Sequence, residues 1–167
     1  MKKTKKLTLM AALCAVALTI FVAEAQIPAV VPIPGVKLGL ANIVTLLTMV
    51  LLGKREAGAV LAVRLILGSI FTGSVSALLF SAAGGALAYL VMCLTIGLFP
   101  EKLLWVVSVL AALAHNAGQL AAAVWVSGTT GILVYAPALV ADGIVTGVFT
   151  GLGAMYLARA LKKLNLK

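Results

Sequence analysis

Residues 103–126 read LLWVVSVLAALAHNAGQLAAAVWV and contain no Asp, Glu, Lys or Arg. An α-helix rises about 1.5 Å per residue, and about 20 residues cross the hydrocarbon core of a bilayer. The same stretch carries His115, Asn116 and Gln119 near its middle. It therefore predicts a membrane-spanning helix with polar side chains inside the membrane.

Apolar runs of similar length fill the chain on both sides of this stretch. The chain has 167 residues, of which 63% are hydrophobic and 10% charged, whereas roughly 25% are charged in a soluble domain. So short a chain cannot hide this much apolar surface from water, so we expect lipid to be its solvent. We predict an all-α bundle in the cell membrane, one transmembrane domain over residues 1–167 with six spans at about 7–22, 38–52, 57–72, 75–98, 103–126 and 137–158.

The predicted breaks contain residues that end helices or favour turns. They are Pro28, Pro32, Pro34 and Gly35 in a non-helical first loop, polar turns at 53–56 and 99–102, a Gly/Ser/Thr loop at 127–131, and Pro137 in the first turn of the last helix. The third and fourth spans are divided only by Thr72, Gly73 and Ser74.

The basic residues orient the spans. With the N-terminus inside, the inner segments hold eleven of the thirteen Lys and Arg residues, while Lys37 is the one in an outer loop and Arg64 lies within a span. Lys and Arg favour the cytoplasmic side, so both termini are predicted to be cytoplasmic. The net charge of +9 thus flanks the spans and faces lipid headgroups, and we predict no nucleic-acid partner.

The first span has an alternative interpretation. A Lys-rich start, an apolar stretch and Ala23-Glu24-Ala25 are similar to a cleavable signal peptide that ends in A-x-A. Cleavage would leave five spans with the same orientation, so the basic residues do not distinguish a retained first span from a cleaved signal peptide. An intact N-terminus in mass spectrometry would show that the first span is retained.

Several polar side chains fall inside the predicted spans, where a charge costs at least about 2.5–3.5 kcal/mol and usually faces the protein interior. They are Arg64, His115, Asn116, Gln119 and Asp142, with Asn42 and Lys37 near the outer surface. At about 1.5 Å per residue, Asn42 lies roughly 6 Å and Asp142 roughly 8 Å below the outer surface. His115 and Gln119 lie roughly 18 and 24 Å above the inner side, and Arg64 only about 10 Å. We therefore expect a polar site in the outer half of the membrane, toward which Arg64 would have to reach.

Structural roles remain open for each of these residues. Arg64 and Asp142 could form an interior ion pair. His115, Asn116 and Gln119 could be interhelical hydrogen bonds, worth only about 0.6 kcal/mol each on average. Lys37 could be a headgroup anchor.

Small residues repeat at a spacing of four in two spans. Gly143, Gly147 and Gly151 do so in the last span, and Ala11 and Ala15 in the first. This spacing lets another helix approach closely, and internal packing is its ordinary use.

The motifs of several enzyme classes are absent from the sequence. Around Gly53-Lys54-Arg55, Thr48 stands where a Walker A motif has its first Gly, and Arg55 replaces its Ser/Thr. The only acids are Glu24, Glu56, Glu101 and Asp142, so no aspartate pair can hold Mg²⁺ against a diphosphate. A lone His excludes a His-based zinc site of the usual kind. We predict no catalytic residue, no metal and no cofactor, and hence a binding or transport subunit that is not an enzyme.

Several blocks of sequence carry a resemblance to a known family. They are PGVKLGLAN at 34–42, Arg64, SAAGG at 81–85, AHNAGQ at 114–119, YAP at 135–137 and GIVTG at 143–147. On these blocks the chain resembles the family of heptaprenyl diphosphate synthase component I, also called the Gx transporter family. The HNxGQ block is specific, while Tyr135 departs from the Leu expected there.

That family looks like the substrate-binding S components of energy-coupling-factor (ECF) transporters. The resemblance implies six helices, a substrate pocket near the outer face and a first loop that caps it. It also implies a partner module of two ATPases and a membrane coupling protein. In S components an AxxxA pattern on the first helix contacts the coupling protein, and Ala11 and Ala15 match it.

We therefore predict an S component for uptake of a small anionic or polar metabolite. Lys37, Arg64 and His115 would supply donors or positive charge, Asn42, Asn116 and Gln119 would orient the substrate, and Asp142 would balance Arg64 or accept from the ligand. The hypothesis requires these side chains to meet in one chamber.

Two other functions remain open. One is a membrane accessory subunit of polyprenyl diphosphate or quinone synthesis, and the other is a structural membrane scaffold. The sequence does not name the substrate.

Overall fold

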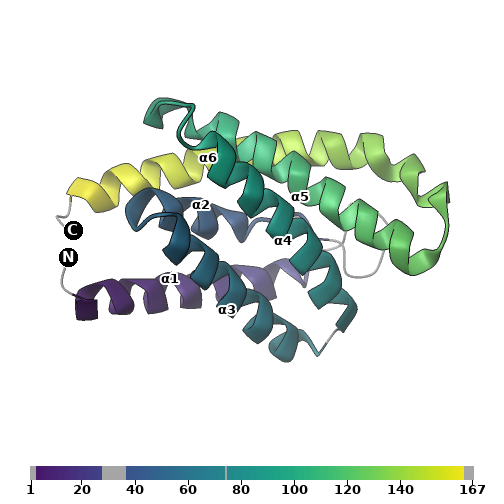
Figure 1. Ribbon diagram of the computed structural model, residues 1–167, viewed down its shortest axis with the longest axis horizontal. Helices are drawn as coiled ribbons and strands as arrows, with labels where there is room; N and C mark the ends of the chain where they lie inside the picture. Colours follow the sequence, from purple (N-terminus) through teal and green to yellow (C-terminus); the bar gives the residue numbers. More distant parts are fainter. Residues whose placement is uncertain (1–2, 28–36, 74, 164–167) are drawn as a thin grey trace.

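The computed structural model describes residues 3–27, 37–73 and 75–163 (Figure 1). Within these ranges the chain is helical and has no strand. Its α-helices are α1 (Lys3–Glu24), α2 (Asn42–Leu51), α3 (Lys54–Thr72), α4 (Val75–Thr95), α5 (Leu104–Ser127) and α6 (Ala136–Lys163). The 3₁₀-helices η1 (Glu101–Leu103) and η2 (Thr130–Tyr135) precede α5 and α6. Each of the six predicted segments therefore contains a helix.

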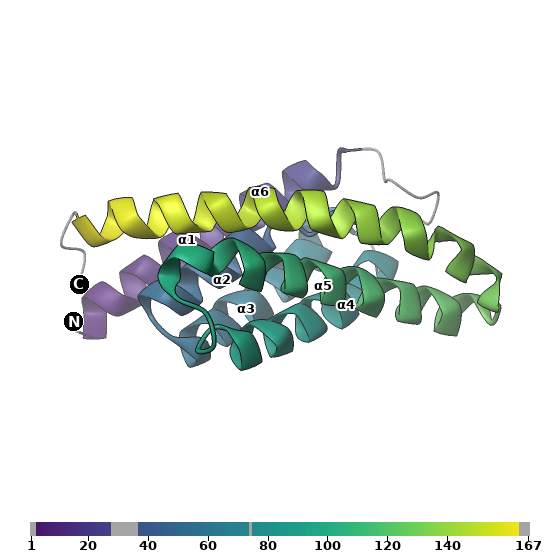
Figure 2. The same ribbon diagram turned by 90° about the horizontal axis from the view of Figure 1, so that it is seen from above.

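The helices form one elongated bundle in which successive helices run in opposite directions. α1 begins and α6 ends at the same end of the bundle (Figure 1). Figure 2 shows α5 and α6 side by side along most of their length. Two ion pairs lie at the end where α1 begins: Lys6 of α1 with Glu56 of α3, and Lys162 of α6 with Glu101 of η1 at 2.7 Å.

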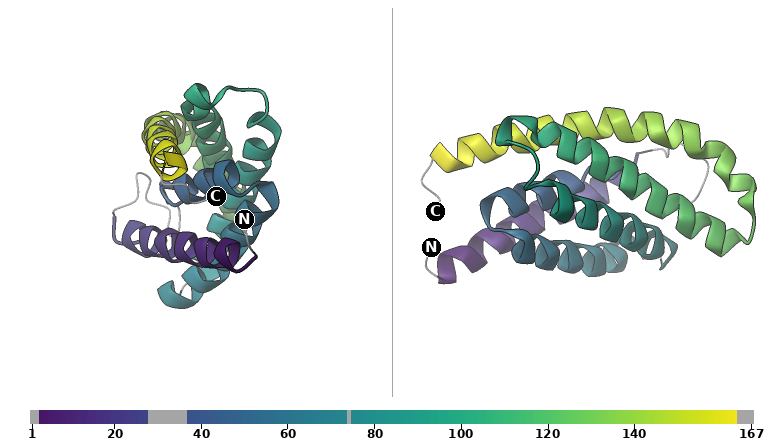
Figure 3. Two further views of the ribbon diagram at one scale, coloured as in Figure 1. Left: turned by 90° about the vertical axis from the view of Figure 1, so that its left-hand side faces the viewer. Right: turned by 45° about the horizontal axis from the view of Figure 1, so that its top comes forward.

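The shortest α-helix, α2, is the centre of the bundle. It contacts all five other α-helices, and the end-on view in Figure 3 shows it between α1, α3 and α6. Its buried residues are Asn42, Val44, Thr45, Leu46, Leu47, Thr48 and Met49. Because neighbours cover most of its circumference, α2 has little surface left for lipid.

The start of α2 differs from the predicted span at 38–52. Gly39 has a φ of +79°, a left-handed conformation that glycine adopts without strain and that no α-helix contains. The helix therefore begins only at Asn42 and has 10 residues. At about 1.5 Å per residue it is about 15 Å long, half the thickness of the hydrocarbon core. Thus α2 is too short to cross a membrane by itself.

The other predicted breaks fall close to the observed ones. α3 ends at Thr72 and is capped by Gly73 in the left-handed conformation, which confirms the narrow division before α4. α5 ends at Ser127 with a left-handed Gly128. The sequence did not predict η2, the 3₁₀-helix that follows. The predicted proline-rich loop falls on residues 28–36, outside the described residues.

The surface of the bundle is apolar and part of its interior is polar. Large apolar side chains such as Ile70, Val145 and Phe149 are about 70% exposed (69%, 70% and 69%), whereas Arg64 is 2% and Gln119 0% exposed. Among the described residues, four helical stretches are long and apolar enough to cross a membrane: Lys3–Glu24, Leu78–Thr95, Glu101–Ser127 and Thr130–Lys163. Exposed apolar and buried polar side chains are the arrangement that lipid favours, and the fold is compatible with a helical membrane bundle.

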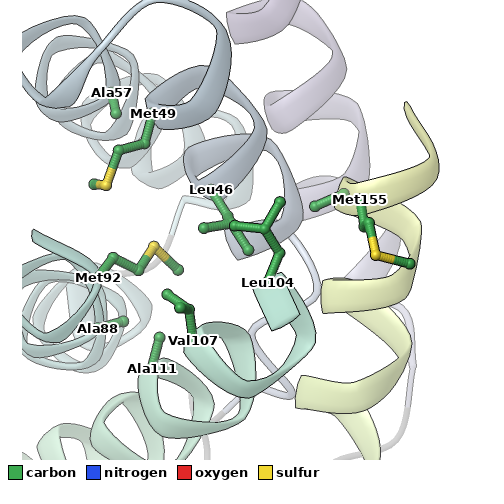
Figure 4. Packing of buried hydrophobic residues seen from close by; sticks show 10 residues of the cluster. Leu46, Met49, Ala57, Ala88, Met92, Leu104, Val107, Ala111 and Met155 are labelled. Carbon is green, nitrogen blue, oxygen red and sulfur yellow. The ribbon is translucent and has the colours of Figure 1, made fainter. Parts of the chain in front are cut away.

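The main apolar core lies nearer the end of the bundle at which α1 begins. Leu46 of α2, Met92 of α4 and Val107 of α5 meet there, all at most 1% exposed (Figure 4). Close packing continues along α5 and α6, because a Cβ on Gly147 would lie 2.6 Å from the Cα of Val109 and one on Gly151 2.5 Å from the Cα of Trp105. The predicted packing role of the Gly143, Gly147 and Gly151 repeat is confirmed.

Candidate functional site

A small cavity lies between the last turn of α1, the segment before α2, and the middle of α3, α4 and α5. Its lining residues are Phe21, Glu24, Lys37, Gly39, Ala41, Asn42, Arg64, Ser81 and His115. About 10 Å³ of it is open to a water-sized sphere, which is room for about one water molecule. The elements therefore converge on one place, but the chamber is smaller than the predicted ligand-sized one.

Lys37 reaches this cavity from the irregular segment between α1 and α2. Its Nζ is buried and lies 3.4 Å from the centre of the Phe21 ring, a cation–π contact. Among the residues that the structure describes, Nζ has no hydrogen-bond partner. Burial lowers the pKa of Lys37 from its ordinary value and nearby Arg64 lowers it further, while Glu24 acts in the opposite direction. The buried ammonium group is left ready for an acceptor.

Arg64 comes to the same cavity from the middle of α3. It is 2% exposed, and its Nε and Nη1 atoms have no partner within the described part of the chain. Its Cζ lies 5.8 Å from the centre of the Phe21 ring. Arg64 therefore reaches the site, as the prediction required. The alternative interior ion pair with Asp142 is not formed, since the described ion pairs are Lys6–Glu56 and Lys162–Glu101.

Phe21 is able to lie beside both cations because α3 has a glycine, Gly68, against its ring. A Cβ on Gly68 would lie 2.5 Å from the Phe21 ring, which real contacts do not allow. The ring is 3% exposed. The contact between α1 and α3 thus positions the Phe21 ring, near which both Lys37 and Arg64 lie.

Glu24 is a lining residue that the sequence reasoning missed. It is 4% exposed, and its Oε1 accepts a hydrogen bond from the backbone N–H of Gly39. The sequence does hold a signal, because Glu24 is the only acid among the first 55 residues. On sequence alone, Glu24 is used only in the A-x-A cleavage motif and in the count of acids that excludes a Mg²⁺ site. Cleavage after Ala25 would remove both Phe21 and Glu24 from the cavity.

His115 is held in the cavity wall by Gln119 and by glycines on two neighbouring segments. The Nε2 of Gln119 lies 3.0 Å from the Nε2 of His115, and the Oε1 of Gln119 accepts from the backbone N–H of Lys37 at 3.3 Å. A Cβ on Gly84 would lie 2.7 Å from the Nδ1 of His115, and one on Gly39 2.9 Å from its Cδ2. Gln119 itself supports the site without lining the cavity.

Two other predicted site residues lie elsewhere. Asn116 donates hydrogen bonds to the carbonyl oxygen of Leu139 at 2.8 Å and to Oδ2 of Asp142 at 2.9 Å. Both contacts belong to the α5–α6 interface, and neither Asn116 nor Asp142 lines the cavity. The structure therefore brings Lys37, Asn42, Arg64 and His115 together at the cavity. Asn116 and Asp142 are instead hydrogen-bonded to each other in the α5–α6 interface.

The predicted partner-binding residues lie on the outer surface of α1. Ala11 and Ala15 are both exposed, whereas Leu13 and Ala17 of the same helix are buried against the bundle. The face that carries Ala11 and Ala15 is therefore open to another helix.

The side chains that line the cavity suit an anion better than a metal ion. Its wall contains two cationic side chains, one carboxylate and the side chains of Asn42, Ser81 and His115. Across residues 3–27, 37–73 and 75–163 no group of three or more His, Cys, Asp or Glu side chains could hold a metal ion.

Comparison with known families identifies the chain. The family described as heptaprenyl diphosphate synthase component I matches residues 13–157, well over half of the sequence. The chain belongs to this family. The matched range includes every residue that lines the cavity. The component I family is one of membrane proteins, and its name describes part of a multi-subunit system and not a catalytic subunit. No curated protein and no solved structure matches the chain.

Proposed function

We propose that this protein is the substrate-binding S component of an ECF-type, ATP-driven uptake transporter for a small anionic metabolite. The observation that carries the proposal is the cavity in which the Nζ of Lys37 and the guanidinium of Arg64 are buried without an ion pair among the described residues. A buried charge that no protein group balances is expensive. An anionic ligand would offset that cost, because its acceptor oxygens would satisfy the unpartnered N–H groups.

In this proposal the lining residues have different roles in binding. Lys37 and Arg64 hold the anionic group, and Asn42 and Ser81 orient it. His115 is a fixed part of the wall, since Gln119 holds its ring. Because the cavity has room for about one water molecule, we propose that this is a closed form and that the walls move apart to admit substrate.

Energy would come from partner proteins. The sequence has no Walker A motif, so an ATP-driven cycle needs separate ATPases and a membrane protein that couples them to this chain. The exposed Ala11–Ala15 face of α1 is the proposed contact with that coupling protein, since small residues let a second helix approach closely.

In the proposed orientation both termini are cytoplasmic and six segments cross the membrane, the second of them through α2 together with residues 37–41 before it. At the end of the bundle where α1 begins and α6 ends, Lys54 and Arg55 begin α3 and Lys102 lies in η1, which agrees with the preference of Lys and Arg for the cytoplasmic side. The cavity adjoins the last turn of α1 and would then be nearer the outer face.

Reconstitution tests the transport function. The chain is placed in vesicles with the two ATPases and the coupling protein, and ATP-dependent uptake is measured across a panel of labelled small anions. We expect uptake of at least one anion that is lost with an ATPase variant unable to hydrolyse ATP and with Lys37→Gln. Intact module assembly without uptake of any anion would contradict the proposal.

A second candidate function follows from the family description. An accessory subunit of heptaprenyl diphosphate synthesis would use the same two cations toward a diphosphate group. Co-purification separates the candidates, since a soluble prenyl synthase bound to the chain supports the accessory role, whereas ATPases and a coupling protein support transport.

A further inference from the structure

The charges around the cavity do not cancel. In their ionised forms, Lys37 and Arg64 each contribute one positive charge to this wall and Glu24 one negative charge. Residues 28–36, which connect α1 to this region in sequence, contain no ionisable side chain, so they cannot change this sum. The cavity therefore has one positive charge in excess, provided that His115 is neutral.

The hydrogen bonds of Gln119 make His115 neutral. The Oε1 of Gln119 accepts from the backbone N–H of Lys37, which leaves the amide Nε2 facing the imidazole. An amide NH₂ group can only donate, so the Nε2 of His115 must accept and carries no proton. The ring then has its proton on Nδ1 and adds a dipole but no charge to the wall.

Glu24 lowers the net positive charge of the site but does not pair directly with either cation. It forms no ion pair within 4 Å with Lys37 or Arg64, as the described ion pairs are at the other end of the bundle. Its Oε1 is instead held by the backbone N–H of Gly39. The two cations consequently keep free N–H groups, while the carboxylate acts on them only through its field.

We infer that the cavity selects a singly charged anion over a doubly charged one, and that Glu24 sets this selectivity by cancelling one of the two positive charges. The inference rests on the proposed function, because it assigns the charge of the ligand that the cavity binds. One negative charge neutralises the site, whereas a second would be buried without a counterion and would face Glu24.

Methanesulfonate and sulfate form a suitable pair of probes because both are tetrahedral and similar in size but carry one and two negative charges. Binding to the purified full chain in detergent is measured by calorimetry at constant ionic strength. We expect the wild-type protein to prefer methanesulfonate by about tenfold or more, the effect of one unit charge at several ångströms in a medium of effective dielectric constant about 20.

Two substitutions shift the charge of the site in opposite directions. Glu24→Gln keeps an acceptor for Gly39 and raises the excess to two, so the preference should move toward sulfate by about tenfold or more. Glu24→Gln combined with Lys37→Met returns the excess to one and should restore the preference for methanesulfonate. A merely structural role of Glu24 predicts no such reversal and recovery.

Lys37→Met alone covers the case in which the Glu24 variants fail to fold. It leaves no excess charge, so the neutral analogue methanesulfonamide should bind better than methanesulfonate. Tighter wild-type binding of sulfate, or a charge preference that neither Glu24 nor Lys37 variants alter, would overturn the inference while leaving an anion site in place. Failure of both probes to bind wild-type protein would instead contradict the proposed function.

Discussion

The cavity and the α5–α6 interface both contain buried polar side chains, but they differ in which groups lack partners. Among the described residues, the cavity leaves charged nitrogens without partners, whereas in the interface the unpartnered buried side-chain atom is the neutral Oδ1 of Asn116. In the interface, Asn116 donates to Leu139 and Asp142, and the hydroxyls of Ser108 and Thr150 lie 2.9 Å apart. In the cavity, Lys37 Nζ and two nitrogens of Arg64 have no partner among the described residues. The interface is also closely packed through Gly147 and Gly151, whereas the cavity keeps a small space.

This difference separates packing from binding. Buried polar groups with partners are what a helix interface in a membrane needs. Buried charges without partners cost free energy in the empty protein, and they are typical of sites where a ligand supplies the missing partner. Substitutions in the two regions should therefore affect different properties, stability at the interface and ligand binding at the cavity.

The largest effect is expected from Gly151→Val in the interface. Even a Cβ at this position would lie 2.5 Å from the backbone of Trp105, so α5 and α6 would have to separate. We expect a loss of about 3 kcal/mol or more in stability, measured as a lower melting temperature and less monodisperse protein. Gly97→Ala is the control, because a Cβ there meets nothing within 4 Å; equal behaviour of the two variants would show that this packing is unimportant.

Arg64→Met should weaken anion binding without lowering stability, in contrast to Gly151→Val. Removing a buried charge that has no ion pair is expected to leave the melting temperature of the empty protein unchanged or higher. Anion affinity should fall about 30-fold or more, corresponding to about 2 kcal/mol. Calorimetry with methanesulfonate measures the second effect.

The exposed Arg159→Met serves as the control for Arg64, and neither property should change in it. A purely structural scaffold predicts lower stability of Arg64→Met and no anion binding by any form of the protein. That outcome would remove the distinction between the two regions.

Asn116→Ala should lower stability moderately and leave anion affinity unaltered. It removes the hydrogen bonds to Leu139 and Asp142, and the expected loss is about 1–2 kcal/mol. Chemical denaturation in detergent, with exposed Ser127→Ala as the control, measures it. A selective loss of anion binding would instead return Asn116 to the ligand site.

The smallest effect is expected from the partly exposed pair of Lys6 and Glu56. The hydrogen bond from Lys6 holds the pKa of Glu56 below its ordinary value of 4.5. The stabilisation is therefore present above about pH 4.5 and disappears as the pH falls through the lowered pKa. The melting temperatures of wild type and Glu56→Gln should differ slightly at pH 7 and converge at acid pH.

Lys6→Met is the matched control for Glu56→Gln and should give the same convergence. A difference that persists in acid would show that the contribution does not come from the ionised carboxylate.

Much of the fold could be predicted because apolar length and helix-breaking residues are local properties. The breaks at Gly53, Gly73 and Gly128 follow from residues that adopt the left-handed or extended conformations that end helices. The start of α2 could not be predicted in this way. It depends on Gly39 being held against His115 and bonded to Glu24, residues distant in sequence.

The site was predictable in part, for a related reason. Asn42, Arg64 and His115 could be recognised because a polar side chain within a membrane span is costly wherever it faces, and Lys37 because it is the one basic residue predicted in an outer loop. Asn116 and Asp142 met the same criterion, yet they pair with each other. Periodicity gives the direction of a side chain on its own helix but not which neighbour it meets.

The sequence by itself determined an apolar, helical chain whose few intramembrane polar groups must be buried, since cost in lipid depends only on residue type and position along a span. Tertiary structure alone decided which of these groups have partners. Helix crossings that the small residues permit give Asn116 an acceptor in Asp142, and they leave Lys37 and Arg64 beside the Phe21 ring with no ion-pair partner among the described residues.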